Sequence, residues 1–155
     1  MLSKEYIKDL KNNKTDVLKI LINKNLSNYG NLVFILENLG HLPSNFEGKW
    51  LIELTQSKYP EVRKLAIKNI AKLKQIECLE ELYNIIKTES NTNVRREAVS
   101  AIGRMRNINN KKILIEILSD NDPKIVCQAI RGLLVFKNDK DIEDTLKPLI
   151  NHENE

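Results

Sequence analysis

The sequence predicts an all-α fold, and three observations support this prediction. The 155 residues include only 5% aromatic residues, five glycines and four prolines, whereas β-sandwiches and β-barrels use more aromatic and turn-forming residues. Apolar residues recur at helical spacing along most of the chain. Three stretches also align without a gap at spacings of 32 and 31 residues. A fixed period of this length is typical of stacked helix pairs.

Each of the three aligned stretches predicts the second helix of a pair. The stretches begin at Tyr59, Asn91 and Asp122 and read YPEVRKLAIKNIAKLK, NTNVRREAVSAIGRMR and DPKIVCQAIRGLLVFK. Pro60 and Pro123 suit a first helical turn, and Asn91 and Asp122 can cap free backbone amides. Helix starts are therefore expected near residues 60, 92 and 123. One column holds only alanine, which suits closely approaching helices: Ala66, Ala98 and Ala129.

A first helix is predicted before each of these stretches, over FEGKWLIELTQS, CLEELYNIIKTE and KKILIEILSD. Upstream, residues 3–22 and 31–42 predict a divergent pair, and downstream DIEDTLKPLINH predicts a fourth first helix. The chain is thus expected to be one solenoid domain over residues 1–155. Its expected parts are a divergent pair, three repeats and a half repeat, over residues 1–45, 46–75, 77–107, 108–138 and 139–155.

The pattern of these repeats resembles a known family. The order of aspartate, proline, valine, arginine and alanine in NVRREAVSAIG and DPKIVCQAI is similar to the HEAT repeat, particularly its PBS-lyase-like form, over residues 46–151. This resemblance implies a right-handed α–α superhelix, a HEAT-like solenoid of about four and a half helix pairs whose second helices line the concave face. The same two stretches are similar to HEAT segments associated with bacterial and archaeal DNA methyltransferase proteins. The chain itself has no methyltransferase motif.

Positive charge is concentrated in the predicted second helices. The net charge is +4, yet residues 61–74, 93–106 and 123–137 hold all six arginines and six lysines against two acids, Glu61 and Glu97. Arginine favours phosphate or carboxylate recognition because its planar group binds both in a bidentate manner. The favoured ligand is the DNA backbone, in a non-catalytic module that is part of, or partner to, a DNA-modification system. An acidic segment of a partner protein is the alternative, and a merely solvated face stays open.

Six cations are the candidate nucleic-acid-binding residues: Lys64, Lys68, Lys72, Arg96, Arg104 and Arg131. The first three recur every four residues and so form one row along a helix. No acid lies four residues from Lys68, Lys72 or Arg104 in the same helix to pair with it.

Two further arginines, Arg63 and Arg95, follow the valine of the repeat pattern. The family resemblance assigns them to a structural ladder of polar contacts between neighbouring repeats. Val126 takes this place in the third copy, so the ladder is expected to stop there.

The sequence contains no constellation of residues that predicts catalysis, a metal or a cofactor. His41 and His152 lie far apart, and no phosphate-binding loop or nucleophile motif is found. Cys78 and Cys127 lie among apolar residues and are expected to be reduced and packed. No segment reaches the roughly 18 apolar residues that span a membrane, and no secretory leader is recognised, so a cytoplasmic protein is expected.

The second helix of the third repeat, predicted over residues 123–137, is apolar on nearly all sides, which is typical of a helix covered all round. The sequence after it stops in the middle of a repeat. The chain is therefore expected to be a fragment of a longer protein, or to dock or dimerise through this helix. Part of the set Ile125, Val126, Leu134 and Val135 should be exposed in this chain alone.

Overall fold

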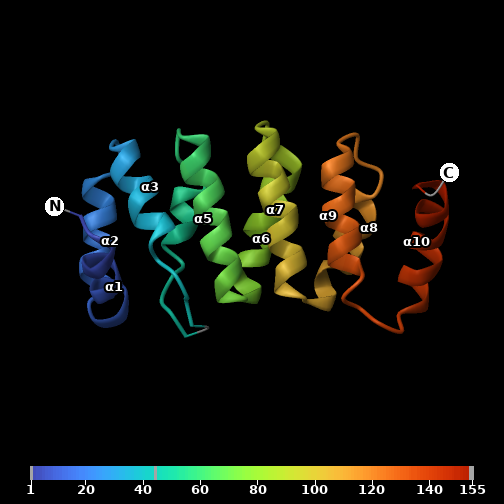
Figure 1. Cartoon of the computed structure of the whole chain (residues 1–155), viewed down its shortest axis with the longest axis horizontal. Helices are drawn as coiled ribbons and strands as arrows, with labels where there is room; N and C mark the ends of the chain where they lie inside the picture. The colour runs from blue at the N-terminus through green and yellow to red at the C-terminus, as the bar shows by residue number, and fades with distance from the viewer. Residues whose placement is uncertain (1, 44, 154–155) are drawn as a thin grey trace. The chain divides into compact units, whose positions relative to one another are not determined.

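The computed structural model describes residues 2–43 and 45–153. These residues form α-helices, short 3-10 helices, turns and loops, and none of them lies in a β-strand (Figure 1). The predicted fold class, an all-α solenoid of repeated helix pairs, is confirmed. No helix among the described residues is both long and apolar enough to cross a bilayer. The chain divides into two compact units, Met1–Glu81 (unit 1) and Leu82–Glu155 (unit 2).

The helices of unit 1 are α1 (Lys4–Asn13), α2 (Thr15–Lys24), α3 (Tyr29–Glu37), α4 (Leu51–Leu54), α5 (Pro60–Leu73) and the 3-10 helix η1 (Ile76–Cys78). The prediction of one helix over residues 3–22 is wrong. The backbone leaves the helical region at Lys14, where φ is −144° and ψ is 60°, so α1 ends there and α2 begins. The two helices then pack against each other as a hairpin.

A buried amide, Asn69, holds α5 against α3 in unit 1. Its Nδ2 donates hydrogen bonds to the carbonyls of Leu36 (3.0 Å) and Leu65 (2.9 Å). Its Oδ1 accepts a hydrogen bond from Lys72 at 2.9 Å. A buried amide is stable only when its polar atoms are paired, and here both are. Asn69 therefore fixes both the position of α5 and the direction of the Lys72 side chain.

Helix α6 (Leu79–Thr88) begins at the end of unit 1 and continues into unit 2, which also contains α7 (Thr92–Met105), the 3-10 helix η2 (Ile108–Asn110), α8 (Lys111–Ile117), α9 (Pro123–Leu133) and α10 (Lys140–Glu153). The three second helices α5, α7 and α9 begin at residues 60, 92 and 123, so the predicted starts are confirmed. Asn91 and Asp122 cap α7 and α9 by accepting hydrogen bonds from backbone amides. Helix α10 confirms the helix predicted after the third repeat, as the first helix of a fourth pair.

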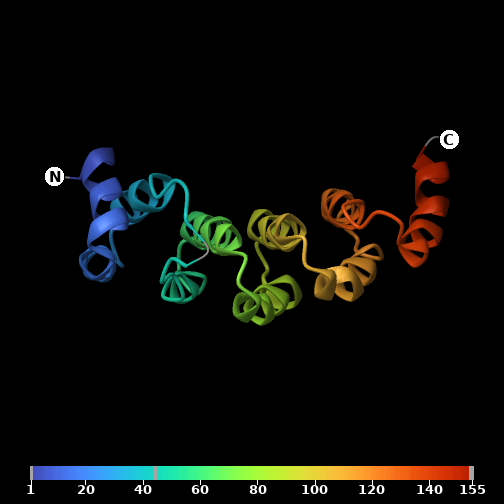
Figure 2. The ribbon, with the colours of Figure 1, turned by 90° about the horizontal axis from the view of Figure 1, so that it is seen from below.

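Within unit 2, α7 and α9 pack side by side and α8 lies in a second layer (Figure 2). The closest approach of α7 and α9 is at two glycines. A Cβ placed on Gly132 would lie 3.1 Å from the Gly103 Cα and 3.1 Å from the Leu114 Cδ1. Ala98 and Ala129 are fully buried as well, but the tightest contact lies nearer the helix ends than the alanine column indicates.

Helix α9, the second helix of the third repeat, is shorter than predicted. Helix α9 ends at Leu133 rather than at residue 137, because the chain turns: the Phe136 amide donates to the Leu133 carbonyl and Asn138 takes a left-handed conformation with φ of 67°. Leu134 is 54% exposed, whereas Ile125 is fully buried. The prediction that part of the apolar set is exposed in this chain is therefore confirmed.

The start of α8 is held by a buried asparagine. Asn110 is fully buried, and its Nδ2 donates to the Ile102 carbonyl at 2.9 Å. Its Oδ1 accepts a hydrogen bond from the hydroxyl of Tyr83 on α6. One side chain thus joins α6, the end of α7 and the beginning of α8.

Candidate anion-binding interface

The candidate cations of unit 1 lie along α5. Lys64 is half-buried, and Lys68 and Lys72 are exposed. Lys72 donates hydrogen bonds to the Gly40 carbonyl (2.7 Å) and to Asn69, so much of its donor capacity stabilises the fold of unit 1. The side chains of Lys64 and Lys68 form no hydrogen bond or ion pair with any other residue that the structure describes.

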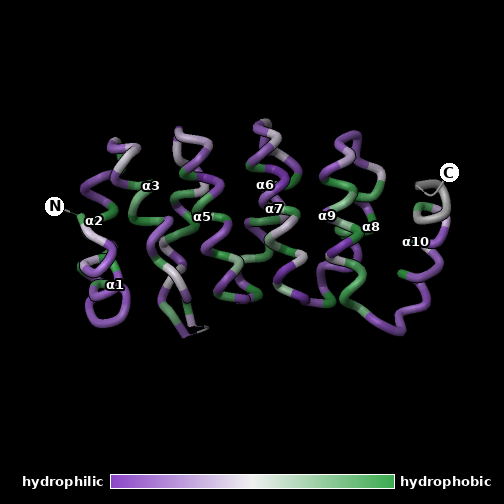
Figure 3. The backbone as a smooth tube through the Cα atoms, viewed as in Figure 1, coloured by the Kyte–Doolittle hydropathy of each residue, from purple (hydrophilic) through white to green (hydrophobic). Residues whose placement is uncertain are grey.

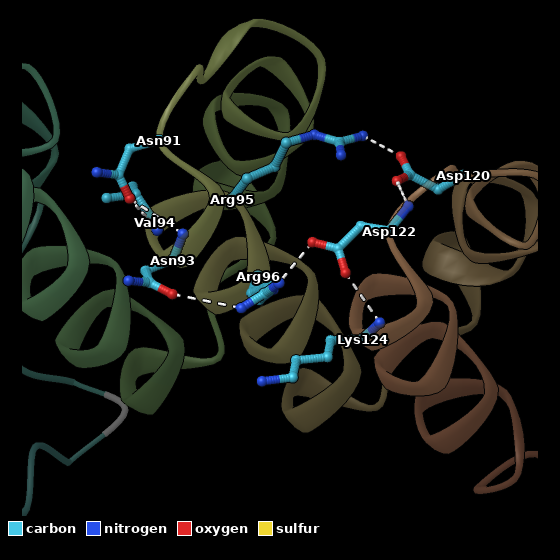
Figure 4. Close-up of polar contacts among 8 residues, drawn as sticks. All are labelled: Asn91, Asn93, Val94, Arg95, Arg96, Asp120, Asp122 and Lys124. Atoms are coloured by element: carbon cyan, nitrogen blue, oxygen red, sulfur yellow. Dashed lines mark hydrogen bonds and ion pairs between the residues drawn. The ribbon is translucent and has the colours of Figure 1, made fainter.

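In unit 2, Arg96 on α7 binds a carboxylate of the next repeat. Its Nε donates to Asp122 Oδ2 at 2.9 Å, and its Nη1 donates to Asn93 Oδ1 at 3.4 Å (Figure 4). Asp122 also caps α9 through the amide of Lys124. The ion pair therefore ties the first turn of α9 to α7. The sequence interpretation treated Arg96 as free for a ligand and did not anticipate this partner.

Arg104 has a carboxylate partner within its own helix. Its Nη2 binds Glu97 Oε2 at 2.9 Å, and its Nη1 donates to the Ser100 hydroxyl at 2.6 Å. Glu97 lies not four residues but two turns before Arg104, and the long arginine side chain reaches it. The Arg104 side chain is still 45% exposed, so part of its guanidinium faces solvent.

Arg131 on α9 differs from the two arginines of α7. It is exposed, and its side chain forms no hydrogen bond or ion pair with any other described residue. Lys124, two turns earlier on the same helix, is exposed too. Of the predicted cations in unit 2, Arg131 is therefore the one whose charge is not offset by a neighbouring carboxylate.

The two arginines assigned to the ladder bind backbone carbonyls, and Arg95 also binds a carboxylate. Arg63 Nη1 donates to the Ser57 carbonyl at 2.9 Å. Arg95 Nε donates to the Ile86 carbonyl of α6 at 2.8 Å, and its Nη2 pairs with Asp120 in the turn before α9 (Figure 4). The structural role of these arginines stays a prediction, and the Arg95 contacts support it.

Arg95 and Arg96 of α7 lower the pKa values of two aspartates at the start of α9, Asp120 and Asp122. The hydrogen bond from Arg95 lowers the pKa of Asp120 below its usual value, and the hydrogen bond from Arg96 lowers the pKa of Asp122. Burial opposes both shifts but is the smaller effect. The Asp120 hydrogen bond in turn raises the pKa of Arg95.

Acid is therefore expected to weaken unit 2 through these carboxylates. A carboxylate with a lowered pKa in the folded state stabilises the protein above its unfolded pKa of about 3.9, and this contribution is lost as the pH falls through the folded pKa. An Asp120→Asn, Asp122→Asn double variant cannot titrate there. It should lose less stability than the parent on acidification, as measured by urea unfolding at each pH. Asp144→Asn, an exposed position on α10, is the control and should keep the parent's pH dependence; the same dependence in the double variant would contradict the assignment.

The described residues do not bring metal-ligating side chains together: no three His, Cys, Asp or Glu side chains among them are close enough to hold a metal ion. Cys78 is buried, and burial raises the pKa of its thiol. The prediction of a packed cysteine is confirmed for Cys78 and wrong for Cys127, which is exposed. The reason is its position, two residues from both Ile125 and Ala129, which occupy the buried side of α9.

Sequence reasoning missed the carboxylates that neutralise α7. A repeated signal could have revealed them. Asp120 Oδ1 accepts from the Asp122 amide at 2.9 Å, just as Glu89 Oε1 accepts from the Asn91 amide at 3.0 Å. An acid two residues before the helix cap thus marks both turns locally, and in the turn before α9 this acid, Asp120, is the one that Arg95 binds.

Comparison with known proteins agrees with this architecture. The family model described as HEAT repeats matches residues 48–133, which include α4 through α9. No curated protein matches the chain.

Proposed function

Because this chain belongs to the HEAT-repeat family, we propose that it is a non-catalytic binding module that holds an acidic segment of a partner protein against α7 and α9. Carboxylates of the ligand bind Arg131 and Lys124 and the exposed part of Arg104. HEAT repeats generally serve as scaffolds, and such a module needs no reaction chemistry of its own.

The pairing of arginine with carboxylate on this face carries the proposal. Arg96 and Arg104 each hold a carboxylate oxygen at 2.9 Å, and Arg131 is exposed without such a partner. The guanidinium group matches the planar shape of a carboxylate. Because Asp122 and Glu97 already neutralise Arg96 and Arg104, the surface of α7 and α9 offers separate cations rather than a continuous row of positive charge. Spaced acidic side chains suit this pattern better than the close phosphates of DNA.

Duplex DNA is the second candidate ligand, and the lysine row of α5 favours it. Lys64, Lys68 and Lys72 recur every four residues along one helix. Contacts from such a row would be to phosphates and would carry no base specificity. A place in a DNA-modification system would follow from this candidate, and it rests on the sequence resemblance alone.

Reversal of the charge at Arg131 tests the proposed function. Binding of a fluorescein-labelled polyglutamate peptide at low salt, measured by fluorescence anisotropy, should weaken about fivefold in Arg131→Glu, because one attraction becomes a repulsion. Lys112→Glu is the matched control: Lys112 is exposed on α8, in the other layer, and its reversal changes the net charge equally. An equal loss in both variants would mean that only net charge matters and would contradict the site.

Duplex DNA in the same assay separates the two candidates. If DNA is the ligand, the logarithm of the association constant should fall with the logarithm of the salt concentration, with a slope of about 0.9 for each phosphate contacted. Lys68→Glu should then reduce that slope. Binding of DNA without binding of polyglutamate would contradict the acidic-segment proposal. Binding of neither would contradict both candidates.

A further inference from the structure

An apolar groove lies between the end of α9 and α10. Its volume is about 580 Å³, and its apolar lining consists of Leu133, Leu134, Phe136, Ile142 and Leu146. Hydrophobic residues occupy the end of α9 and the residues just after it, up to the hydrophilic turn that precedes α10 (Figure 3). The groove belongs entirely to unit 2 and is separate from the charged residues of the proposed interface.

The lining side chains present an unfilled surface. Leu133, Ile142 and Leu146 form its base and are at most 2% exposed. Leu134 lines the same groove and is 54% exposed. An apolar hollow of this size, with an exposed leucine at its edge, is a usual place for a binding partner.

The preceding helix pair shows what fits such a groove. Helix α9 is the second helix of its pair and packs against both α7, the previous second helix, and α8, its own first helix. Helices α9 and α10 stand in the same order along the chain as α7 and α8. The groove between α9 and α10 therefore corresponds to the place that a second helix fills one repeat earlier.

We infer that this groove binds one amphipathic helix of a partner protein, with acidic residues beside its apolar side. The apolar side packs on Leu134 and Phe136, as in other helix-in-groove complexes. The acidic residues face Lys137 and Lys147, which lie at the rim together with a single acid, Glu143.

Charge selects this occupant over a second copy of the chain. The second helices of this protein are themselves basic: α9 has Lys124 and Arg131 and no acid, and α7 has three arginines against Glu97. Placing one of these helices in the groove would bring like charges to Lys137 and Lys147. An acidic helix from another protein forms favourable pairs at the same positions.

A synthetic peptide tests the inference directly. Its sequence is that of residues 122–137 with four changes, Lys124→Glu, Arg131→Glu, Lys137→Glu and Cys127→Ser, so that it keeps the apolar pattern of a second helix and becomes acidic. A second peptide keeps the native cations. Both carry a fluorescent label and are titrated with the whole protein.

The parent protein is expected to bind the acidic peptide more tightly than the basic one. Leu134→Asp should weaken binding of the acidic peptide at least about tenfold, because the substitution removes an apolar contact and adds a charge of the same sign as the peptide's. Ile108→Asp is the matched control, since Ile108 is 56% exposed in the same unit but lies outside the groove, and it should bind like the parent. A Lys137→Glu, Lys147→Glu double variant should reverse the preference between the two peptides.

Three outcomes would overturn the inference. They are equal binding by Leu134→Asp and the parent, no binding of the acidic peptide by the parent, and a parent dimer in light scattering that Leu134→Asp dissolves. The last would identify a second copy as the occupant. Circular dichroism checks that each variant stays helical, and because Leu134 and Ile108 are both exposed, neither substitution disturbs the core.

Discussion

Gly132→Leu is expected to lower the free energy of unfolding of unit 2 by about 3 kcal/mol, because a larger side chain in this tight contact forces the two helix backbones apart. The nearest atom to a Cβ at this position belongs to the backbone of Gly103, at 3.1 Å, and backbone cannot move aside as a flexible side chain can. For a chain of this length the loss corresponds to a fall of roughly 6–12 °C in the melting temperature. Thermal unfolding followed by circular dichroism measures it.

Gly30→Leu provides the control for this prediction. Gly30 is also helical, but a Cβ there would meet only the Asn28 side chain, at 3.8 Å. Since leucine favours helices more than glycine does, this variant should be as stable as the parent or more so. If Gly132→Leu were equally well tolerated, the close contact between α7 and α9 would not exist in solution.

Asn110→Leu is expected to lower the free energy of unfolding by about 3 kcal/mol, because it removes the donor of the buried Ile102 carbonyl and one acceptor of the Tyr83 hydroxyl. Urea unfolding measures the loss. In a Tyr83→Phe background the same substitution should cost about 1 kcal/mol less, since the hydrogen bond between the Tyr83 hydroxyl and Asn110 is already absent. Asn109→Leu, at an exposed neighbouring position, should change stability by less than about 0.5 kcal/mol. Equal costs at positions 109 and 110 would contradict the buried network.

The starts of the second helices could be predicted from the sequence because they depend on local chemistry. Pro60 and Pro123 fix the first turn, and the side chains of Asn91 and Asp122 satisfy amides two or three residues ahead. Such signals lie within one turn of the residues that they affect. The repeat spacing then made each start visible more than once.

The partners of the cations could not be predicted in this way. Asp122 lies 26 residues after Arg96, and the two meet only because α7 and α9 pack at the separation that their glycines allow. The break at Lys14 and the turn after α9 depend on the backbone conformations of Lys14 and Asn138, which are neither proline nor glycine. The charge of each second helix was thus evident from the sequence, but the pairing of Arg95 and Arg96 with the turn before α9 is a property of packing.

The position of Cys127 gives the protein a built-in site for a spectroscopic label. Its thiol is exposed on α9 one turn before Arg131, whereas Cys78, the other cysteine of the chain, is buried and has a raised pKa. A thiol-reactive dye at neutral pH should therefore attach to Cys127 in preference to Cys78 without any engineered substitution. Its emission then reports from the helix that carries Lys124 and Arg131, where an acidic segment is proposed to bind.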